Sequence, residues 1–359
     1  MSARRDVQDG ASARREGPAA TRANRDVRVV IVNYRTAKLA IDCLASLADE
    51  VAQRPGTRVV VVDNASGDGS AEAIAQAIGE RGWSAWAGVL PSAVNGGFAY
   101  GNNLAVRAAL AEPEPPAWFW MLNPDTRVDP GALGALVDFA EAHAEVGIVG
   151  SALENDDGSA WPYAFRFPTV WSEFEGGARF GPLSRLLRSR SVLRPMGDRP
   201  VAVDWMPGAS MMVRREVFDA IGLMDEGYFL YYEETDFFLQ AHRAGWQSWY
   251  VPASRVMHIA GASTGVTGEK VMKKRMPAYW FESRRRYFVK NHGRAYAMLV
   301  DAAWLVAHLS WRARRALQRK PDTDPPRLAA DFVSHSALLH GGLPGNAALT
   351  AAGAPARGR

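Results

Sequence analysis

The stretch that most constrains the fold is an apolar run, Trp118–Leu122, closed by the polar turn Asn123-Pro124-Asp125. A run of this length that ends at a turn former predicts a buried strand of a parallel sheet. Ligands of open α/β sheets bind beyond the carboxyl ends of the strands, so we expect Asp125 at the rim of a ligand crevice. A carboxylate held rigidly there by Pro124 suits a divalent metal on a phosphate. The alternative is that Asp125 caps the helix that starts near Pro130.

Strands and helices alternate along the first half of the chain. We expect strands at 27–32, 58–62 and 85–90, and helices at 37–49, 70–80 and 131–143. A further helix opens at the segment Asn95–Asn103, which is rich in Gly and Asn. This order implies an α/β fold, with a parallel sheet and helices on both of its faces.

The composition is that of a globular protein. The 359 residues are 48% hydrophobic and 22% charged, with a net charge of only +4. The single cysteine, Cys43, excludes an internal disulfide and a cysteine-based zinc site, and its apolar helical surroundings indicate a core position. Residues 1–28 contain no apolar segment of the kind found in secretory signals, so we expect the protein to stay on the cytoplasmic side.

Polar residues follow the expected strands. Asp63, Asn64 and Ser66 come directly after the second strand and can offer donors and acceptors to a nucleobase and ribose. Asp68 and Ser70 are better explained as caps of the next helix. The glycines of Asn95–Asn103 let the backbone approach a ligand closely, although an ordinary loop before a helix would look similar. Neither a G-x-G-x-x-G fingerprint after the first strand nor a Walker loop is present.

Two groups in the second half carry candidate chemistry. Glu233, Glu234 and Asp236 lie at a helix start. Either they are placed there because the positive helix terminus favours carboxylates, or one of them is a general base. Adjacent acids repel each other, which raises one pKa towards a useful value. His258 follows a strand and precedes a glycine-rich loop, so it is either structural or a metal ligand.

Taken together, the motifs resemble family-2 inverting glycosyltransferases with the GT-A fold, which implies a Rossmann-like, mixed and mostly parallel sheet flanked by helices. The resemblance covers about residues 27–265. Within the family, the sequence looks most like bacterial rhamnosyltransferases, including the actinobacterial type that rhamnosylates a polyprenyl-diphosphate-linked GlcNAc. The motifs that carry the resemblance occur in the family's order and are Val32-Asn33-Tyr34, Val62-Asp63-Asn64-x-Ser66, Asn95-x-Gly97-Phe98-Ala-x-Gly101-Asn102, Leu122-Asn123-Pro124-Asp125, Gly208-Ala209, Asp225-Glu226, Tyr232-Glu233-Glu234-x-Asp236 and His258.

The resemblance implies a role for each motif. The catalytic group would be Glu234, with Glu233 and Asp236 beside it, and Asp125 with His258 would bind Mg²⁺ or Mn²⁺ on the donor diphosphate. The residues expected to hold the nucleotide sugar are Asn33, Tyr34, Asp63, Asn64, Ser66, Asn95, Gly97, Phe98, Gly101, Asn102 and Asn123. The residues expected to contact the acceptor are Trp205, Gly208 and Ala209.

Three positions depart from the family pattern. The chain has Glu234 where members usually carry Asp, Gln240 where many carry Arg, and Asn123 in place of the first acid of the D-x-D motif. Glu and Asp have similar ordinary pKa values, so the base role is retained. The third departure leaves fewer anionic ligands for the metal.

The implied reaction is a single in-line displacement. Glu234 would take the proton of an acceptor hydroxyl, and that oxygen would attack the anomeric carbon from the face opposite the diphosphate. We expect L-rhamnose from dTDP-rhamnose to move to a lipid-linked or polysaccharide acceptor in cell-wall or surface glycan synthesis. The alternatives are another UDP- or GDP-sugar donor, a nucleotidyltransferase, and a non-catalytic glycan-binding or scaffold protein.

The C-terminal region is basic and apolar. Residues 284–320 carry ten Lys or Arg and one acid, Asp301, around an apolar stretch, 295–311. Arg294, Asp301, His308 and Arg315 recur every seven residues, which predicts an amphipathic helix with Trp304 and Trp311 near its boundary. Such a helix would lie on the cytoplasmic membrane surface or pack on the catalytic domain; no nucleic-acid motif is present.

We therefore divide the chain into five segments. They are a disordered tail (1–26), a nucleotide-sugar-binding half (27–150), an acceptor-binding and catalytic half (151–280), basic amphipathic membrane-associating helices (281–320) and a mostly disordered tail (321–359).

Overall fold

The protein is described by a computed structural model over residues 26–155, 157–161, 163–259 and 274–351. The expected tail at 1–26 therefore lies, apart from Asp26, outside the described residues. The strands of the main sheet are β1 (Val27–Asn33), β2 (Thr57–Asp63), β3 (Ala87–Pro91), β4 (Trp118–Leu122), β5 (Thr126–Val128), β6 (Val146–Glu154), β7 (Ala160–Trp161), β10 (Val201–Ala202), β11 (Ser210–Arg214) and β12 (Gln247–His258). A separate pair is formed by β8 (Tyr163–Phe165) and β9 (Leu193–Pro195).

The main sheet has ten strands and is mixed. Its order is β10-β12-β6-β11-β4-β1-β2-β3, with β5 paired to β12 and β7 paired to β6. The strands β3, β2, β1 and β4 are parallel, and β11 runs antiparallel between β4 and β6. The apolar run Trp118–Leu122 is thus an inner strand, as its sequence predicts.

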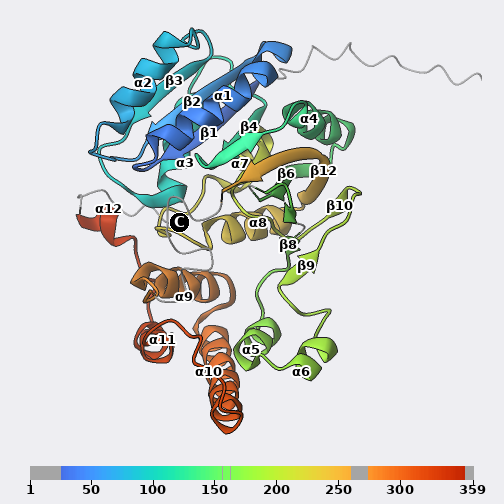
Figure 1. The fold of residues 1–359 in the computed structure, drawn as a ribbon, viewed down its shortest axis with the longest axis vertical. Helices are drawn as coiled ribbons and strands as arrows, with labels where there is room; N and C mark the ends of the chain where they lie inside the picture. The colour runs from blue at the N-terminus through green and yellow to red at the C-terminus, as the bar shows by residue number, and fades with distance from the viewer. Residues whose placement is uncertain (1–25, 156, 162, 260–273, 352–359) are drawn as a thin grey trace, which may run out of the picture.

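Helices cover both faces of this sheet (Figure 1). The helices of the described residues are α1 (Ala37–Gln53), α2 (Ser70–Glu80), α3 (Gly97–Leu110), α4 (Ala132–Ala142), α5 (Val170–Ala178), α6 (Gly181–Leu186), α7 (Arg215–Ile221), α8 (Glu233–Arg243), α9 (Ala278–His292), α10 (Arg294–Leu317), α11 (Leu328–His335) and α12 (Ala347–Ala351). One core lies between the sheet and α1, α2 and α4, and a second lies between the sheet and α3, α7 and α8.

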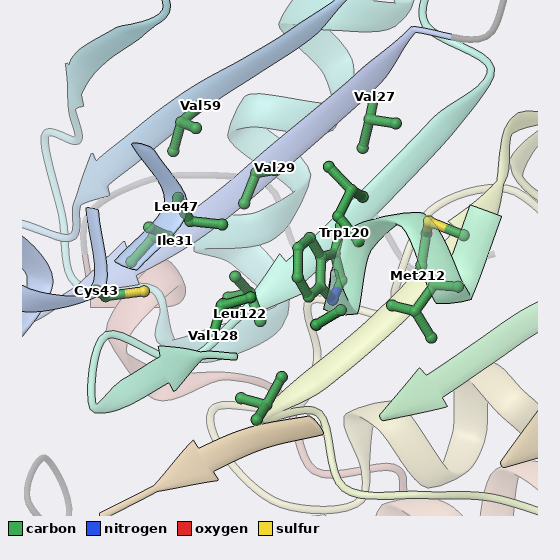
Figure 2. Close-up of a cluster of buried hydrophobic side chains, with 14 of the residues drawn as sticks. Val27, Val29, Ile31, Cys43, Leu47, Val59, Trp120, Leu122, Val128 and Met212 are labelled. Atoms are coloured by element: carbon green, nitrogen blue, oxygen red, sulfur yellow. The ribbon is translucent and has the colours of Figure 1, made fainter. Parts of the chain in front are cut away.

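Strand β4 contributes to both cores because successive side chains point to opposite faces. Trp120 and Leu122 enter the first core, where they join Ile31 and Leu47 (Figure 2), whereas Phe119 enters the second. A strand buried on both faces must be apolar at every position, which is why it reads as a continuous run.

One face of the helical C-terminal region packs against the protein, which is one of its two expected placements. The seven-residue repeat does form one helix, α10, but Asp301 and His308 on it are buried against the protein. Trp304 stacks on Phe332 of α11 with ring centroids 4.0 Å apart, and so it packs within the protein. This face of the helix therefore packs on the protein. The reason is that the buried Arg284 guanidinium needs the Asp301 carboxylate as its partner.

The expectation of disorder after residue 320 differs from the structure over residues 321–351. This segment contains α11 and α12, and specific polar contacts hold it in place. Arg275 donates two hydrogen bonds of 2.7 Å to the Asp331 carboxylate. The Asn346 side chain is buried and donates to the backbone oxygen of Gly96 at 2.8 Å. Residues 352–359 lie outside the described residues.

Candidate active site

A cavity of about 250 Å³ opens at the carboxyl ends of β1, β2 and β4. This edge of an α/β sheet is where ligands bind. Six of the residues predicted to hold the nucleotide sugar line the cavity, namely Tyr34, Asn64, Asn95, Gly97, Phe98 and Asn123. The other lining residues are Val32, Pro124, Phe229, Leu230 and Tyr279.

Three predicted residues, Asn33, Asp63 and Ser66, form a buried hydrogen-bond network. The Asn33 amide donates to Asp63 Oδ1 at 2.8 Å, and the Ser66 hydroxyl donates to the same oxygen at 2.6 Å. All three side chains are almost inaccessible to solvent. The network ties together the ends of β1 and β2, and so it positions Tyr34 and Asn64 in the cavity wall.

The loop before α3 requires glycine at position 97. Gly97 has a φ of +85°, and a Cβ there would lie 1.8 Å from the backbone oxygen of Phe229. Phe98 N donates to that same oxygen at 3.1 Å. Asn64 donates to Asn95 Oδ1 and to Gly97 O. The loop is therefore held by β2 on one side and by the segment before α8 on the other.

Gly101 and Asn102 lie on α3, where they make packing contacts. A Cβ at Gly101 would lie 2.6 Å from Val32 Cγ1, so glycine lets α3 approach β1 closely. The buried Asn102 side chain donates to Phe98 O at 3.0 Å. A direct nucleotide contact by these two residues stays a prediction.

Asp125 and His258 are brought together by the pairing of β5 with β12. His258 pairs with Thr126 in the antiparallel register, and Ile259 N donates to Asp125 O at 2.9 Å. His258 Nε2 consequently lies 3.4 Å from Asp125 Oδ1 and 3.3 Å from Asn123 Nδ2. The His258 ring is also stacked on Trp161, with a centroid distance of 5.9 Å.

These side chains fit a divalent metal that also has ligands from outside the protein. Among the described residues, Asp125 Oδ1 is buried without a hydrogen-bond partner, which leaves it available to a cation. A carboxylate oxygen and an imidazole nitrogen are both suitable ligands. No group of three or more His, Cys, Asp or Glu side chains in the described part of the chain could hold a metal. The remaining ligands would therefore come from a bound diphosphate or water.

Glu233 and Glu234 begin α8 after two residues in the left-handed region. Tyr231 and Tyr232 have φ values of +69° and +68°. This conformation is costly for bulky residues, and such strain persists where the surrounding structure demands one orientation. In the described structure Oε2 of both glutamates is buried without a hydrogen-bond partner.

The two carboxyl groups have different pKa values. Burial raises the pKa of Glu234 to about 7, and backbone N–H groups, including that of Gly208, oppose the rise. Burial and the neighbouring Glu234 raise the pKa of Glu233 well above its ordinary value. The raised pKa of Glu233 favours its protonated form, while Glu234 can release and accept a proton near neutral pH, which is the behaviour of a general base.

Asp236 belongs to a different environment. Its carboxylate accepts from Lys290 Nζ at 2.6 Å and from Asn291 Nδ2 at 2.6 Å, and it lines a second cavity of about 560 Å³. Gln240 donates to Asp236 Oδ1 at 3.2 Å. The structure therefore separates Asp236 from the donor cavity and gives it a contact that joins α8 to α9.

Of the residues predicted to contact the acceptor, Gly208 lies beside Glu234. A Cβ at Gly208 would lie 3.1 Å from the Phe98 ring and 3.9 Å from Glu234 Cβ. Ala209 is buried and its backbone oxygen accepts from Asn123 N at 3.0 Å. Trp205 stacks on Phe165 at 4.4 Å and donates to Arg166 O. Gly208 thus connects the donor cavity, through Phe98, to Glu234.

Comparison with known families decides the identity of this site. Residues 28–222, more than half of the chain, match the profile described as "Glycosyl transferase family 2". The chain belongs to glycosyltransferase family 2. The family, the enzyme class and the mixed GT-A-type sheet expected from the sequence are thereby confirmed.

Relatives with curated names support this assignment. The glycosyltransferase is 31% identical over 305 residues to the N-acetylglucosaminyl-diphospho-decaprenol L-rhamnosyltransferase of Mycobacterium tuberculosis. The alignment covers 80% of this chain and 89% of the relative. It is 29% identical over 167 residues to rhamnosyltransferase WbbL of Escherichia coli, covering 46% of this chain and 61% of the relative.

Solved structures agree in fold. GalNAc-T7, crystallised with UDP, GalNAc and Mn²⁺, aligns with a TM-score of 0.54 at 16% identity. The alignment covers 88% of the glycosyltransferase but only 55% of the GalNAc-T7 chain. At this identity the likeness concerns the fold alone.

Sequence reasoning missed part of the cavity wall. Tyr279 lies on α9, beyond the residues that match the family profile, and its ring centroid is 5.3 Å from that of Phe229. Phe229 belongs to an aromatic segment that the sequence does single out. No local pattern marks Tyr279, because its role depends on how α9 folds back over the segment before α8.

Among the described helices of the glycosyltransferase, none combines the length and the apolar character needed to cross a membrane.

Proposed function

We propose that this glycosyltransferase moves L-rhamnose from dTDP-rhamnose to a hydroxyl of a polyprenyl-diphosphate-linked acceptor in cell-wall or surface glycan synthesis, with inversion at the anomeric carbon. The observation that carries the choice of sugar and acceptor is the match to the mycobacterial L-rhamnosyltransferase along most of both chains. The geometry of the site agrees with this chemistry, as follows.

The donor cavity would hold the nucleotide sugar. Tyr34 and Asn64 offer an aromatic ring and an amide to the nucleoside, while the glycine loop lets its backbone approach the ligand. Asn123, at the end of β4, stands between this cavity and the Asp125–His258 pair.

Asp125 and His258 would hold Mg²⁺ or Mn²⁺. The metal, when bound, neutralises charge that develops on the leaving diphosphate. Buried at the rim of the cavity, the two side chains cannot move far, and so they fix where the diphosphate must lie. Asn123 supplies no charge, so the donor diphosphate itself would provide much of the anionic coordination.

Glu234 would act as the base towards the acceptor hydroxyl. Its pKa near 7 lets it be ionised at cellular pH while still binding a proton well, as an efficient base must. Glu233, kept neutral beside it, would supply a hydrogen bond but no second base. A site with one ionised carboxylate suits a single displacement with inversion.

We further propose that the enzyme works as a peripheral protein at the cytoplasmic face of the membrane, where a polyprenyl-linked acceptor would be reached. The exposed basic residues at the C-terminal end of α10, Arg312, Arg319 and Lys320, support this location, because anionic lipid attracts such clusters.

The test is a panel of donors. Purified enzyme with Mg²⁺ or Mn²⁺ and a polyprenyl-diphosphate GlcNAc acceptor is given dTDP-rhamnose or one of several UDP- and GDP-sugars, and release of nucleoside diphosphate is measured. We expect acceptor-dependent release from dTDP-rhamnose alone. Preferential turnover of a UDP- or GDP-sugar would refute the proposed donor, and release that never depends on the lipid acceptor would refute the acceptor.

A further inference from the structure

Helix α10 presents Asp301 and His308 to the protein. Asp301 and His308 are 2% and 1% exposed. Asp301 is paired with Arg284 and accepts from Ala337 N at 2.6 Å, while His308 Nε2 lies 3.5 Å from Asp324 Oδ2. Asp301 and His308 therefore interact with α9 and with the C-terminal segment.

The opposite side of α10 is apolar and exposed. Leu299, Val306, Leu309 and Leu317 are 55, 61, 59 and 85% exposed, and we call them the α10 stripe. Their spacing of seven, three and eight residues places them along one side of the helix, where small residues, Ala302, Ala303, Ser310 and Ala313, lie between them. Single exposed apolar residues are common, but a continuous line along a helix indicates an interaction surface.

Basic residues surround the end of this stripe. Arg312, Arg319 and Lys320 are exposed at the C-terminal end of α10. Helix α6 lies beside α5 at the same end of the molecule (Figure 1), and the Arg314 guanidinium of α10 packs over the Phe180 ring that precedes α6.

Helix α6 adds the same combination of groups. Leu186 is 78% exposed between the exposed Arg185 and Arg188. Over residues 181–197 and 294–320 the only acid is Asp301, which is buried. The surface therefore combines exposed leucines with an excess of positive charge, of which Arg315 and Arg179 are paired with Asp322 and Asp324.

We propose that the α10 stripe and its basic rim form the face that docks onto an anionic lipid bilayer, with α10 lying parallel to the membrane plane. Leucines would enter the boundary between headgroups and acyl chains while the arginines bind lipid phosphates. A second copy of the chain fits this face less well, because a symmetric contact would bring the same cations against each other. The inference deepens the proposed membrane location, and its purpose rests on the proposed lipid-linked acceptor.

The first experiment measures binding of the full-length protein to vesicles by cosedimentation, without donor or acceptor. Vesicles of phosphatidylcholine alone are compared with vesicles that also contain phosphatidylglycerol. We expect binding to the anionic vesicles and much weaker binding to the neutral ones. Equal binding to both, or binding to neither, would overturn the proposal.

A stripe variant tests the apolar contribution. Leu299→Gln, Val306→Gln and Leu309→Gln together should lower the vesicle partition coefficient by at least about tenfold, since each leaves an apolar contact unmade. Leu193→Gln, at an exposed apolar position on β9, is the control and should bind like the wild type. Since all three stripe residues are exposed, thermal unfolding and donor binding should remain unchanged. Unimpaired vesicle binding by the stripe variant would contradict the proposal.

A charge variant tests the basic rim. Arg312→Gln, Arg319→Gln and Lys320→Gln together should lower partitioning by on the order of a hundredfold, from about 1 kcal/mol for each charge near an anionic surface. The matched control removes the same charge from the N-terminal half, with Gln at the exposed Lys38, Arg58 and Arg81. Equal loss in both variants would show that only net charge matters and would overturn the assigned face.

Two further readouts separate this inference from others. Sedimentation velocity without lipid should show a monomer; a dimer that the stripe variant abolishes, in a protein that ignores vesicles, would assign the face to a second copy instead. Because vesicle binding needs neither donor nor acceptor, failure of rhamnosyl transfer leaves this result intact, and failure of vesicle binding leaves the assigned reaction intact.

Discussion

Two adjacent glutamates illustrate how position decides chemistry at the scale of single residues. Both lie at the start of α8, yet Glu233 is 2% exposed while Glu234 is partly accessible and lies beside Gly208. The more deeply buried carboxyl holds its proton, and this relieves the repulsion that a second charge would cause. The pair therefore offers one base at neutral pH.

The pKa of Glu234 leads to a pH prediction. Since burial raises this pKa to about 7, the acid form predominates below neutral pH and cannot take a proton from the acceptor. We expect kcat/KM to fall as the pH drops through about 7, by about tenfold for each pH unit further down. Initial rates at fixed metal and subsaturating acceptor measure this, and a flat profile into mild acid would contradict it.

Removal of the metal tests the proposed role of Asp125 and His258 as metal ligands. A chelator is expected to lower turnover by at least about a hundredfold, with recovery on adding Mg²⁺ or Mn²⁺. Asp125→Asn should need far more metal for half-maximal rate, because it loses the buried unpaired oxygen. Asp68→Asn is the control, since Asp68 is an exposed partner of Ser70. Full activity of the wild type in excess chelator would disprove the metal role.

Gly97 gives a test of the donor loop. Gly97→Ala puts a side chain where φ is +85° and where the Phe229 oxygen would be 1.8 Å away, so the loop must shift. We expect the donor Kd, measured by calorimetry, to rise by at least about tenfold. Gly79→Ala serves as the control, because a Cβ there meets nothing within 4 Å. Unchanged donor affinity in Gly97→Ala would show that the loop does not shape the cavity.

At the scale of elements, the C-terminal segment is tied to the donor loop. Asn346, just before α12, donates to Gly96 O at 2.8 Å and to Glu226 O at 3.1 Å. Arg286 of α9 donates to Pro344 O at 2.7 Å. The last described helix therefore supports a loop that lies about 250 residues earlier in the chain.

Asn346→Ala should weaken this support. Loss of the amide leaves buried carbonyls unpaired, which we expect to lower the free energy of unfolding by about 1–3 kcal/mol. A positioning role predicts in addition a higher donor KM with nearly unchanged kcat. Gln53→Ala, which removes an exposed amide at the end of α1, is the control. A loss of stability with unaltered KM would reduce Asn346 to a structural residue.

Elements differ in how far their sequences predict them. Strand β4 is predicted correctly because burial on both faces leaves an unmistakable apolar run. The helix of α10 is predicted, but not its orientation, since a seven-residue repeat does not say which face meets the protein. The order in residues 321–351 is missed because a few specific contacts, such as those of Asp331 and Asn346, maintain it in place of a large apolar face.

At the scale of the whole molecule, one sheet joins the two predicted halves. Strand β11, from the second half, lies between β4 and β6, and so residues from both halves meet at one edge. The meeting of Asp125 with His258 follows from the resemblance, and the β5–β12 register supplies its physical cause. Tyr279 could not be predicted, since nothing local marks a helix that returns to the cavity from outside the family's motifs.

The central claim is that Glu234 is the base of an inverting rhamnosyl transfer, and a paired substitution tests it most directly. Rhamnose transfer from dTDP-rhamnose to the polyprenyl-linked acceptor is measured for Glu234→Gln and Glu233→Gln, with donor Kd determined for both. We predict that Glu234→Gln loses at least about a hundredfold in kcat with an unchanged donor Kd. Glu233→Gln, which mimics a carboxyl that is already protonated, should retain most of its activity. Retained transfer in Glu234→Gln, or an equal loss in both variants, would contradict the account.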